Sequence, residues 1–327
     1  MLRSVAIDIT NHCNLNCIHC LRDKLSERAH LDLDILDTLL KEMNSLGILE
    51  TSLTGGEPAL HPELRKIFEM HLRYGIFFSL VSNGYLFKEK IYPLISDNVY
   101  EYLTGVCFSL DGPEAYFHDR IRGKGSFKRV IESIKLCIKD EIPVSIKSII
   151  YRENMKTLAD TAILCSELGV EQLGFVILTP TPKLLAEGLL PSKEEYEDII
   201  EFIKAQIKPS FSIQIDIEGY ADPEFKVPFC NPAYGLSIDH LGNLIFCCNL
   251  SHPTAGDRPD SFGKEYLGNI REIGLEEGIL RHYRLFSWFI KKILSNQNES
   301  RYGSNCVDCF RLFGKLDWLD RYESTHN

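Results

Sequence analysis

The sequence lacks several features that would place it in a specialised class of protein. No apolar run approaches the ~18 residues of a membrane-spanning helix, and there is no internal repeat or low-complexity tract. Basic residues are not in excess, because 36 Lys and Arg stand against 46 Asp and Glu, for a formal net charge of -10. This balance argues against a nucleic-acid or anionic-membrane surface and favours a small molecule or a peptide as the partner.

A secretory leader is also not recognisable. The first residues have the pattern of a strand, and no charged-then-apolar segment with a small-residue cleavage site precedes it. We therefore expect a cytoplasmic protein. The 327 residues favour about two domains. Eleven cysteines in such a protein indicate metal or redox chemistry more than structural disulfides.

Eight of the eleven cysteines are grouped along the chain. The groups are Cys13, Cys17 and Cys20, then Cys230, Cys247 and Cys248, then Cys306 and Cys309. Cys107, Cys137 and Cys165 stand alone among apolar neighbours, so we expect them to be small core residues.

The first cysteine group has C-x3-C-x2-C spacing and follows the apolar run 5–9. Thiolates are soft ligands that favour iron-sulfur clusters, copper(I) or zinc. Three thiolates are one too few for a closed four-ligand site, so a 4Fe-4S cluster held here would keep one iron open for a small molecule. Three buried thiols, or a zinc loop with a distant fourth ligand, are the alternatives.

Short β-rich runs alternate with helical patterns from residue 1 to about 208, which predicts βα units around a parallel sheet. Strands are expected at 4–9, 50–53, 77–81, 106–110, 144–150 and 172–177. Helices are expected at 33–46, 62–74, 88–95, 127–139, 155–168 and 193–208. Six such units are too few for a closed eight-stranded barrel.

A second motif follows the second expected strand, where the carboxyl ends of parallel strands collect functional residues. It consists of Gly55, Gly56, Glu57 and Pro58. The two glycines allow a close approach of the backbone, and Glu57 offers a carboxylate to an ammonium group. Taken alone, this motif would be an ordinary turn.

Together, the cysteine loop and the Gly-Gly-Glu-Pro motif one βα unit later resemble the radical S-adenosylmethionine (SAM) enzymes. In that family SAM chelates the open iron of the 4Fe-4S cluster, and the second motif holds the amino group of SAM. The resemblance implies an α/β fold with a partial (β/α)6 TIM-like barrel over residues 1–208. It also implies that Cys13, Cys17 and Cys20 are the cluster ligands and the catalytic core.

The resemblance gives roles to polar residues after the third and fourth strands. Ser82, Asn83, Ser109 and Asp111 resemble the contacts to the ribose and methionine parts of SAM. The competing interpretation is turn chemistry, because Asn-Gly and Asp-Gly pairs are common turn formers.

Two basic side chains complete the expected SAM site. Arg122 is expected to grip the methionyl carboxylate as a planar fork, with Arg120 as the fallback and an exposed helix-end arginine as the alternative. Lys147 lies inside an expected strand, where a lysine is costly to bury without a partner. It either contacts substrate or SAM at the barrel mouth or extends from the sheet edge into water.

The second half of the chain carries the other cysteines. A strand-like pattern at 211–217 places a domain boundary at about residue 209, with 209–327 as a small α+β domain. The spacing C-x11-G-x4-C runs from Cys230 to Cys247, with residues 239–243 as a hairpin turn between two strands. Cys306 and Cys309 add a C-x2-C pair after the helical stretch 272–294.

This half resembles the SPASM/twitch extension of many radical SAM enzymes. No cysteine follows Cys309, whereas the full SPASM module has more, so we expect one auxiliary 4Fe-4S cluster as in the shorter twitch form. The expected ligands are Cys230, Cys247, Cys306 and Cys309. Cys248 would point to the opposite face of a strand, although an exchange of roles with Cys247 stays open. Structural zinc is the alternative occupant.

The resemblance implies a radical SAM oxidoreductase that cleaves SAM to a 5'-deoxyadenosyl radical and removes a hydrogen atom from its substrate. The first hypothesis is oxidative modification of a ribosomally made peptide through a crosslink or thioether. The second is oxidation of a small polar metabolite such as a sugar alcohol or aminocyclitol, and the third is a non-catalytic metal-binding protein. Expected partners are a flavodoxin- or ferredoxin-type electron donor and, for a peptide substrate, a separate peptide-recognition protein, but no nucleic acid or membrane.

Overall fold

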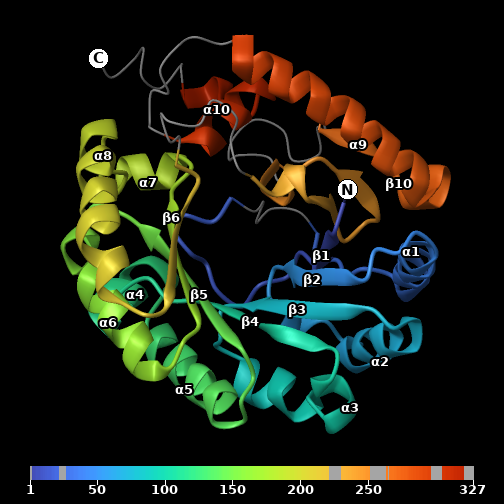
Figure 1. Ribbon diagram of the computed structural model, residues 1–327, viewed down its shortest axis with the longest axis horizontal. Helices are drawn as coiled ribbons and strands as arrows, with labels where there is room; N and C mark the ends of the chain where they lie inside the picture. The colour runs from blue at the N-terminus through green and yellow to red at the C-terminus, as the bar shows by residue number, and fades with distance from the viewer. Residues whose placement is uncertain are drawn as a thin grey trace.

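The computed structural model describes residues 2–21, 27–220, 230–250, 263, 265–295 and 304–319. Within these residues one ten-stranded sheet runs in the order β10-β9-β8-β1-β2-β3-β4-β5-β6-β7. The sheet curves, and helices α1, α2, α3, α5, α6 and α8 lie along its outer side, while α9 and α10 lie across the side between α1 and α7 (Figure 1).

Strands alternate with helices along the chain from β1 to β7. The strands are β1 (Ser4–Thr10), β2 (Glu50–Gly55), β3 (Phe77–Ser82), β4 (Leu103–Ser109), β5 (Val144–Ile150), β6 (Gln172–Ile177), β7 (Gln214–Glu218), β8 (Gly235–Ile238), β9 (Asn243–Ile245) and β10 (Tyr266–Asn269). The helices are α1 (Leu33–Ser45), α2 (Leu64–Tyr74), α3 (Asp97–Tyr100), α4 (Ala115–Arg122), α5 (Ser126–Lys139), α6 (Leu158–Leu168), α7 (Pro182–Ala186), α8 (Lys193–Phe202), α9 (Ile270–Ser295) and α10 (Asn305–Leu312).

The six predicted βα strands all form and pair in parallel in chain order, so the predicted parallel α/β sheet is confirmed. The capping box at the start of α8 forms, because the Ser192 side chain accepts from the Glu195 backbone and the Glu195 side chain accepts in return. Gly75 and Gly169 end α2 and α6 in the left-handed conformation, as expected for helix C-termini.

Some expectations need correction. The expected helix 88–95 is two short turns, Phe87–Ile91 and Tyr92–Leu94, because a proline interrupts the pattern. The short helices α3, α4 and α7 were not expected. The hairpin turn at 239–243 is confirmed between β8 and β9.

The sheet continues past the proposed boundary at residue 209. Strand β7 pairs in parallel with β6, and β8 pairs in parallel with β1 at the other side of the barrel strands. Strands β8, β9 and β10 then form an antiparallel extension. The boundary itself stays a prediction, and these pairings show that the second half contributes strands to both ends of the barrel sheet.

The two faces of the barrel strands differ in polarity. In β4 and β5, Val106, Phe108, Val144 and Ile146 are buried against the outer helices in the main hydrophobic core. Alternate positions point the other way, to the inner side of the curve. Cys107 is one of these inner residues: it is partly exposed and hydrogen-bonds Ser145.

Cys107 is therefore not the core residue that its apolar neighbours indicated. Its sequence neighbours Val106 and Phe108 belong to the opposite face of the strand. The same prediction is confirmed for Cys137 and Cys165, which are fully buried in the main core.

A second apolar cluster lies around α9 and α10. Phe246, Leu250, Phe289, Val307 and Phe310 form its buried centre. This cluster joins the β8–β9 hairpin to α10, so it brings the cysteines of the second half into one region. None of the described helices is both long enough and apolar enough to cross a membrane.

Candidate functional site

The first cysteine loop leaves the carboxyl end of β1 and is fastened by backbone hydrogen bonds to two other segments. The amides of Gly56 and Glu57 donate to the carbonyls of Thr10 and His12, at 2.6 and 2.8 Å. At its far end the Ile18 amide donates to a carbonyl of α4 at 3.0 Å. The loop is therefore held between β2 and α4.

The two motif glycines are required by this contact. A Cβ on Gly55 would lie 2.3 Å from the Thr10 carbonyl oxygen, and one on Gly56 would lie 1.9 Å from the His12 carbonyl oxygen. Both distances fall far below any real Cβ contact, and the opposing atoms are backbone atoms that have no freedom to move aside. The glycines thus admit the cysteine loop, whereas the sequence indicated only a close approach to some ligand.

Glu57 is completely buried beside the cysteine loop. One carboxylate oxygen accepts from the Ser82 hydroxyl at 2.7 Å, and the other accepts from the Asn83 amide at 2.9 Å. The predicted motif after β2 therefore holds the predicted polar pair after β3 in place. Its role toward the amino group of SAM stays a prediction.

Asn83 reaches from the end of β3 to the cysteine loop. Its side-chain amide nitrogen lies 3.7 Å from the Cys13 sulfur and 3.0 Å from the Asn14 side-chain oxygen. The Asn83 side-chain oxygen accepts from the Tyr85 backbone amide at 2.9 Å. This bridge between two motifs was not visible in the sequence, because nothing in the spacing predicts which side chain meets the loop.

Asp111 and Arg122 form a buried ion pair on the other side of the loop. The Arg122 Nε donates to Asp111 Oδ2 at 2.5 Å, and the Ile149 amide donates to Asp111 Oδ1 at 3.1 Å. Burial opposes the charged form of Asp111, but the Arg122 charge outweighs it and keeps the pKa of that carboxyl below its usual value. Arg122 thus has a carboxylate partner within the protein, and its contact with a SAM carboxylate stays a prediction.

The three loop thiols lie close enough to interact electrostatically. The pKa of Cys17 is raised to about 11, mainly by burial; the Arg122 guanidinium opposes this rise, and the thiols of Cys20 and Cys13 add to it. Arg122 in turn interacts with Cys17 and Cys20. Three thiols that converge beside a fixed positive charge fit the donor set of an iron-sulfur cluster, which requires thiolates.

The remaining basic candidates have partners of their own. Lys147 of β5 forms an ion pair with Glu218 of β7. The two side chains meet over Gly174 of β6, the strand between them. Burial lowers the pKa of Lys147. Arg120 lies at the surface between Glu153 and Glu187, at 3.4 and 2.9 Å. Ser109 lies beside Lys147 in the register of β4 and β5.

The second cysteine group gathers from three separate places. Cys230 precedes β8, Cys247 and Cys248 follow β9, and Cys306 and Cys309 lie in α10. Burial raises the pKa of Cys230 to about 11 and that of Cys306 to about 12, and the two thiols also interact with each other. Cys309 interacts with both Cys306 and Cys230, so these three thiols share one buried region.

This second region is attached to the end of β7. The Asn305 amide donates to the Gly219 carbonyl at 2.9 Å, and the Asn305 side chain donates to the Tyr220 carbonyl at 2.7 Å. A Cβ on Gly219 would lie 3.6 Å from the Cys306 sulfur. Cys306 therefore lies at the carboxyl end of β7.

The choice between Cys247 and Cys248 rests on opposing observations. Strand β9 ends at Ile245, and Cys248 begins a short 3-10 helix, so the argument from opposite strand faces was wrong. Cys247 packs on the same apolar cluster as Cys230 and Cys309. Cys248 interacts with Cys306, and the pKa of its thiol is raised well above the usual value, first by a hydrogen bond with Cys247 and by burial, and to a smaller degree by the charges of Cys247 and Asp8. We give the packing more weight and keep Cys247 as the proposed ligand.

No three His, Cys, Asp or Glu side chains in the described ranges converge as the ligands of a single metal ion. A zinc ion needs four ligands at about 2.3 Å from one point. A 4Fe-4S cluster binds each thiolate at a different iron, so its thiolates stay farther apart. A 4Fe-4S cluster in the second cysteine group stays a prediction, with zinc as its alternative.

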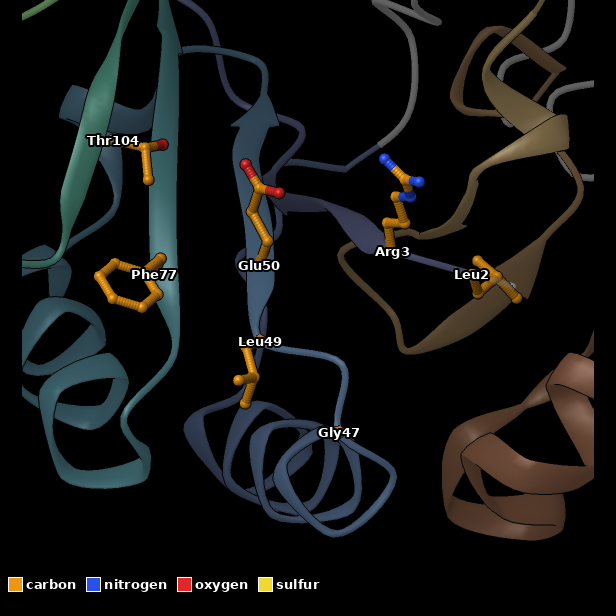
Figure 2. A pocket seen from close by; sticks show the side chains of 7 residues that line it. All are labelled: Leu2, Arg3, Gly47, Leu49, Glu50, Phe77 and Thr104. Carbon is orange, nitrogen blue, oxygen red and sulfur yellow. The ribbon is translucent and has the colours of Figure 1, made fainter.

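A pocket of about 560 Å³ lies at the opposite end of the barrel strands. Figure 2 shows Arg3, Glu50, Phe77 and Thr104 around it, all at or before the amino ends of β1 to β4. The cysteine loop leaves the carboxyl end of β1, so this pocket is separate from the candidate site.

Comparisons with known proteins agree with this geometry. Residues 7–165 match the Radical SAM superfamily. The chain is 29% identical to the AdoMet-dependent heme synthase of Methanosarcina barkeri, over 64% of this chain and 59% of that protein. It is 25% identical to the PqqA peptide cyclase of Gluconobacter oxydans, over 75% of this chain and 69% of that protein.

A solved structure shares the fold. The structure of native anSMEcpe with bound AdoMet and Cp18Cys peptide has a TM-score of 0.66 and 17% sequence identity, over 90% of this chain and 84% of that chain. The parallel sheet with its cysteine loop after β1 thus defines a radical SAM domain. Residues 7–165 of the chain form a Radical SAM superfamily domain. It spans less than two thirds of the length of the heme synthase, at 59%.

Proposed function

We propose that this protein is a radical SAM enzyme that oxidatively modifies a ribosomally made peptide by forming a crosslink or thioether. The observation that carries the proposal is the C-x3-C-x2-C loop locked by backbone hydrogen bonds onto the Gly-Gly-Glu-Pro motif. When bound, a 4Fe-4S cluster and SAM would supply a 5'-deoxyadenosyl radical that removes a hydrogen atom from the substrate.

The protein's own residues hold and orient these groups. Cys13, Cys17 and Cys20 would bind three irons and leave the fourth for SAM. Glu57, Ser82 and Asn83 form one buried network that fixes the edge of the site, and Ser109, Asp111, Arg122 and Lys147 line its other side. Gly55, Gly56 and Pro58 shape the turn that brings the loop and this network together.

The second cysteine group would hold one auxiliary 4Fe-4S cluster through Cys230, Cys247, Cys306 and Cys309. Four protein thiolates leave no open iron for substrate, so this cluster would accept an electron during a net oxidation. Cys306 lies beside the carboxyl end of β7, at the same end of the parallel strands as the first cysteine loop, which supports a path for that electron.

The peptide substrate rests on the relatives. The PqqA peptide cyclase is named for a peptide substrate, and the anSMEcpe structure contains a bound peptide. A small-molecule substrate is the second candidate, because the chain is also similar to a heme synthase. The oxidoreductase class, a flavodoxin- or ferredoxin-type donor, a separate peptide-recognition protein and a cytoplasmic location complete the proposal. Residues 209–327 are proposed as the auxiliary-cluster domain.

The test starts with anaerobically reconstituted protein, SAM and dithionite. We expect release of 5'-deoxyadenosine, measured by liquid chromatography, and none from the Cys17→Ala variant. Short peptides encoded beside the gene are then added, and mass spectrometry is expected to show a peptide that has lost two hydrogen atoms. Intact clusters without 5'-deoxyadenosine would contradict radical SAM chemistry, and 5'-deoxyadenosine formation with unmodified peptides would direct the search to small molecules.

A further inference from the structure

Asn83 meets the cysteine loop through the amide nitrogen of its side chain. One contact of the amide nitrogen is to the Cys13 sulfur at 3.7 Å, and the other is to the Asn14 oxygen at 3.0 Å. An amide nitrogen carries two hydrogens, so these two contacts use both. The Asn83 donors therefore point at the cluster loop, and neither is left for SAM.

The orientation of this amide is fixed by its surroundings. The Tyr85 backbone amide donates to the Asn83 side-chain oxygen at 2.9 Å, so that oxygen has to face Tyr85 and the nitrogen has to face Cys13. The Asn83 backbone amide donates to the buried Glu57 carboxylate at 2.9 Å. Only 8% of Asn83 is exposed, so water does not compete strongly for these bonds.

From this geometry we infer that Asn83 is a positioning residue that hydrogen-bonds the Cys13 sulfur and raises the reduction potential of the first cluster. Glu57 holds the backbone of Asn83, and Asn83 carries the contact to the ligand sulfur. The inference rests on the proposed cluster at Cys13, Cys17 and Cys20, and it deepens that proposal by naming a residue that sets how easily the cluster is reduced.

The direction of the shift in reduction potential follows from electrostatics. Reduction adds one negative charge to the cluster and increases electron density on its thiolate sulfurs. An N–H donor to a sulfur stabilises the more negative state, so it favours reduction. The Arg122 guanidinium, which interacts with Cys17 and Cys20, acts in the same direction from the other side of the loop. Asp111 offsets part of its charge, whereas the neutral Asn83 amide carries no such counter-charge.

The competing role for Asn83 is a direct contact with SAM, and the two roles predict different measurements. A residue that acts on Cys13 changes the potential of the cluster in the absence of SAM. A residue that acts on SAM changes the dissociation constant of SAM and leaves the SAM-free potential unaltered.

The experiment is a redox titration of the reconstituted full chain without SAM, followed by electron paramagnetic resonance. The signal that changes when SAM is added afterwards identifies the first cluster. For Asn83→Ala we expect a shift to more negative potential. The expected size is about a tenfold lower ratio of reduced to oxidised cluster at a fixed potential, or about 59 mV for a one-electron couple.

Two further variants separate the contact with Cys13 from a general effect on the loop. Asn83→Asp keeps an oxygen for the Tyr85 amide but loses the donor to Cys13, so its potential should shift in the same direction and further. Asn14→Ala is the matched control, because it removes the other Asn83 contact in the same loop and leaves the Cys13 contact intact. Its potential should stay at the wild-type value.

Iron and sulfide content is measured for each variant, and potentials are compared only between proteins with equal content. A wild-type potential in Asn83→Ala or Asn83→Asp, with weakened SAM binding, would overturn the inference and assign Asn83 to SAM. An equal shift in Asn14→Ala would also overturn it, because the effect would then come from the loop as a whole. None of these outcomes depends on the substrate, so the inference and the proposed peptide chemistry can fail separately.

Discussion

The two cysteine regions of this protein are built in different ways. The first is one short loop after β1, fastened by backbone hydrogen bonds to the end of β2 and to α4. The second gathers Cys230, Cys247, Cys306 and Cys309 from segments before β8, after β9 and in α10. Apolar packing around Phe246, Phe289 and Phe310 joins these segments, α10 is hydrogen-bonded to the chain that follows β7, and β8 pairs with β1.

The difference matches the separate tasks proposed for the two regions. A cluster that binds SAM has one iron without a protein ligand, and this iron has to be held in a fixed position. Close backbone contacts keep the cysteine loop rigid enough for that. A closed cluster needs only four thiolates at suitable distances, which a packed apolar region can provide. Because strands β8 to β10 and β7 lie at opposite ends of the sheet, the second region also joins the two ends of the barrel.

The difference between the two regions is tested most directly by adding one methyl group to each of them. In Gly56→Ala the new Cβ would lie 1.9 Å from the His12 carbonyl oxygen, so the cysteine loop has to move. A displacement of that size costs about a hundredfold or more in 5'-deoxyadenosine release. In Gly278→Ala the new Cβ would lie 2.4 Å from Leu244 Cδ1, the end of a flexible side chain. Its activity should fall far less, and equal losses would contradict the comparison.

Iron analysis sharpens the ligand assignment in the second region. We expect Cys247→Ala to lose about four of the roughly eight irons of the reconstituted chain, because one 4Fe-4S cluster no longer assembles. Cys248→Ala should keep them, since Cys247, and not Cys248, packs on the apolar cluster with Cys230 and Cys309. Iron and sulfide content with visible absorbance measures both. The reverse result would assign the ligand to Cys248.

Each region has one buried ion pair, and the two pairs should differ in their effect on stability. Asp111→Asn leaves the Arg122 charge buried without its carboxylate, so the free energy of unfolding should fall by about 3–5 kcal/mol. Glu265→Gln removes the carboxylate that pairs with Lys315, and a buried lysine without a partner can lose its proton, whereas an arginine stays charged. We expect a loss of about 1–3 kcal/mol there. Anaerobic chemical denaturation followed by circular dichroism measures both, and a larger loss in Glu265→Gln would be contrary to this account.

Acid should weaken the barrel through a buried histidine. Burial lowers the pKa of His71 to about 4, below its ordinary value near 6.5. As the pH falls from 6.5 toward 4, the unfolded chain therefore takes up a proton that the folded chain does not, and stability is lost. From pH 6.5 to pH 5 the loss is about 2 kcal/mol for this residue.

The matched variant for this prediction is His71→Gln, which does not titrate. Its free energy of unfolding should fall by about 2 kcal/mol less than that of the wild type between pH 7 and pH 5. Denaturation curves at the two pH values measure the difference. An equal fall in both proteins would show that other groups carry the acid sensitivity.

The sequence predicted the barrel better than the second region for a physical reason. Strands β5 and β6 occur at the predicted residues, because alternation and flanking turn signals are local properties. The pairing of β8 with β1 joins residues far apart in the chain, and no local pattern encodes it. The same holds for the Lys147–Glu218 pair, which depends on Gly174 lying between β5 and β7.

The same distinction between local and long-range features applies to the site residues. The cysteine loop and the Gly-Gly-Glu-Pro motif were visible because each is short and contiguous. The contact of Asn83 with Cys13 and the pairing of Asp111 with Arg122 arise only when strand ends meet in space. Helix α4, which buries Arg122, was missed because its polar sequence has little apolar periodicity.

The most direct test of the central claim is SAM cleavage by a chain without the second cysteine pair. The Cys306→Ala, Cys309→Ala double variant is reconstituted anaerobically and given SAM and dithionite. If the first region alone binds and cleaves SAM, this protein should hold about four irons and still release 5'-deoxyadenosine, although it should no longer complete the modification of its substrate. A variant with about four irons and normal SAM binding that releases no 5'-deoxyadenosine would contradict the division between the two regions.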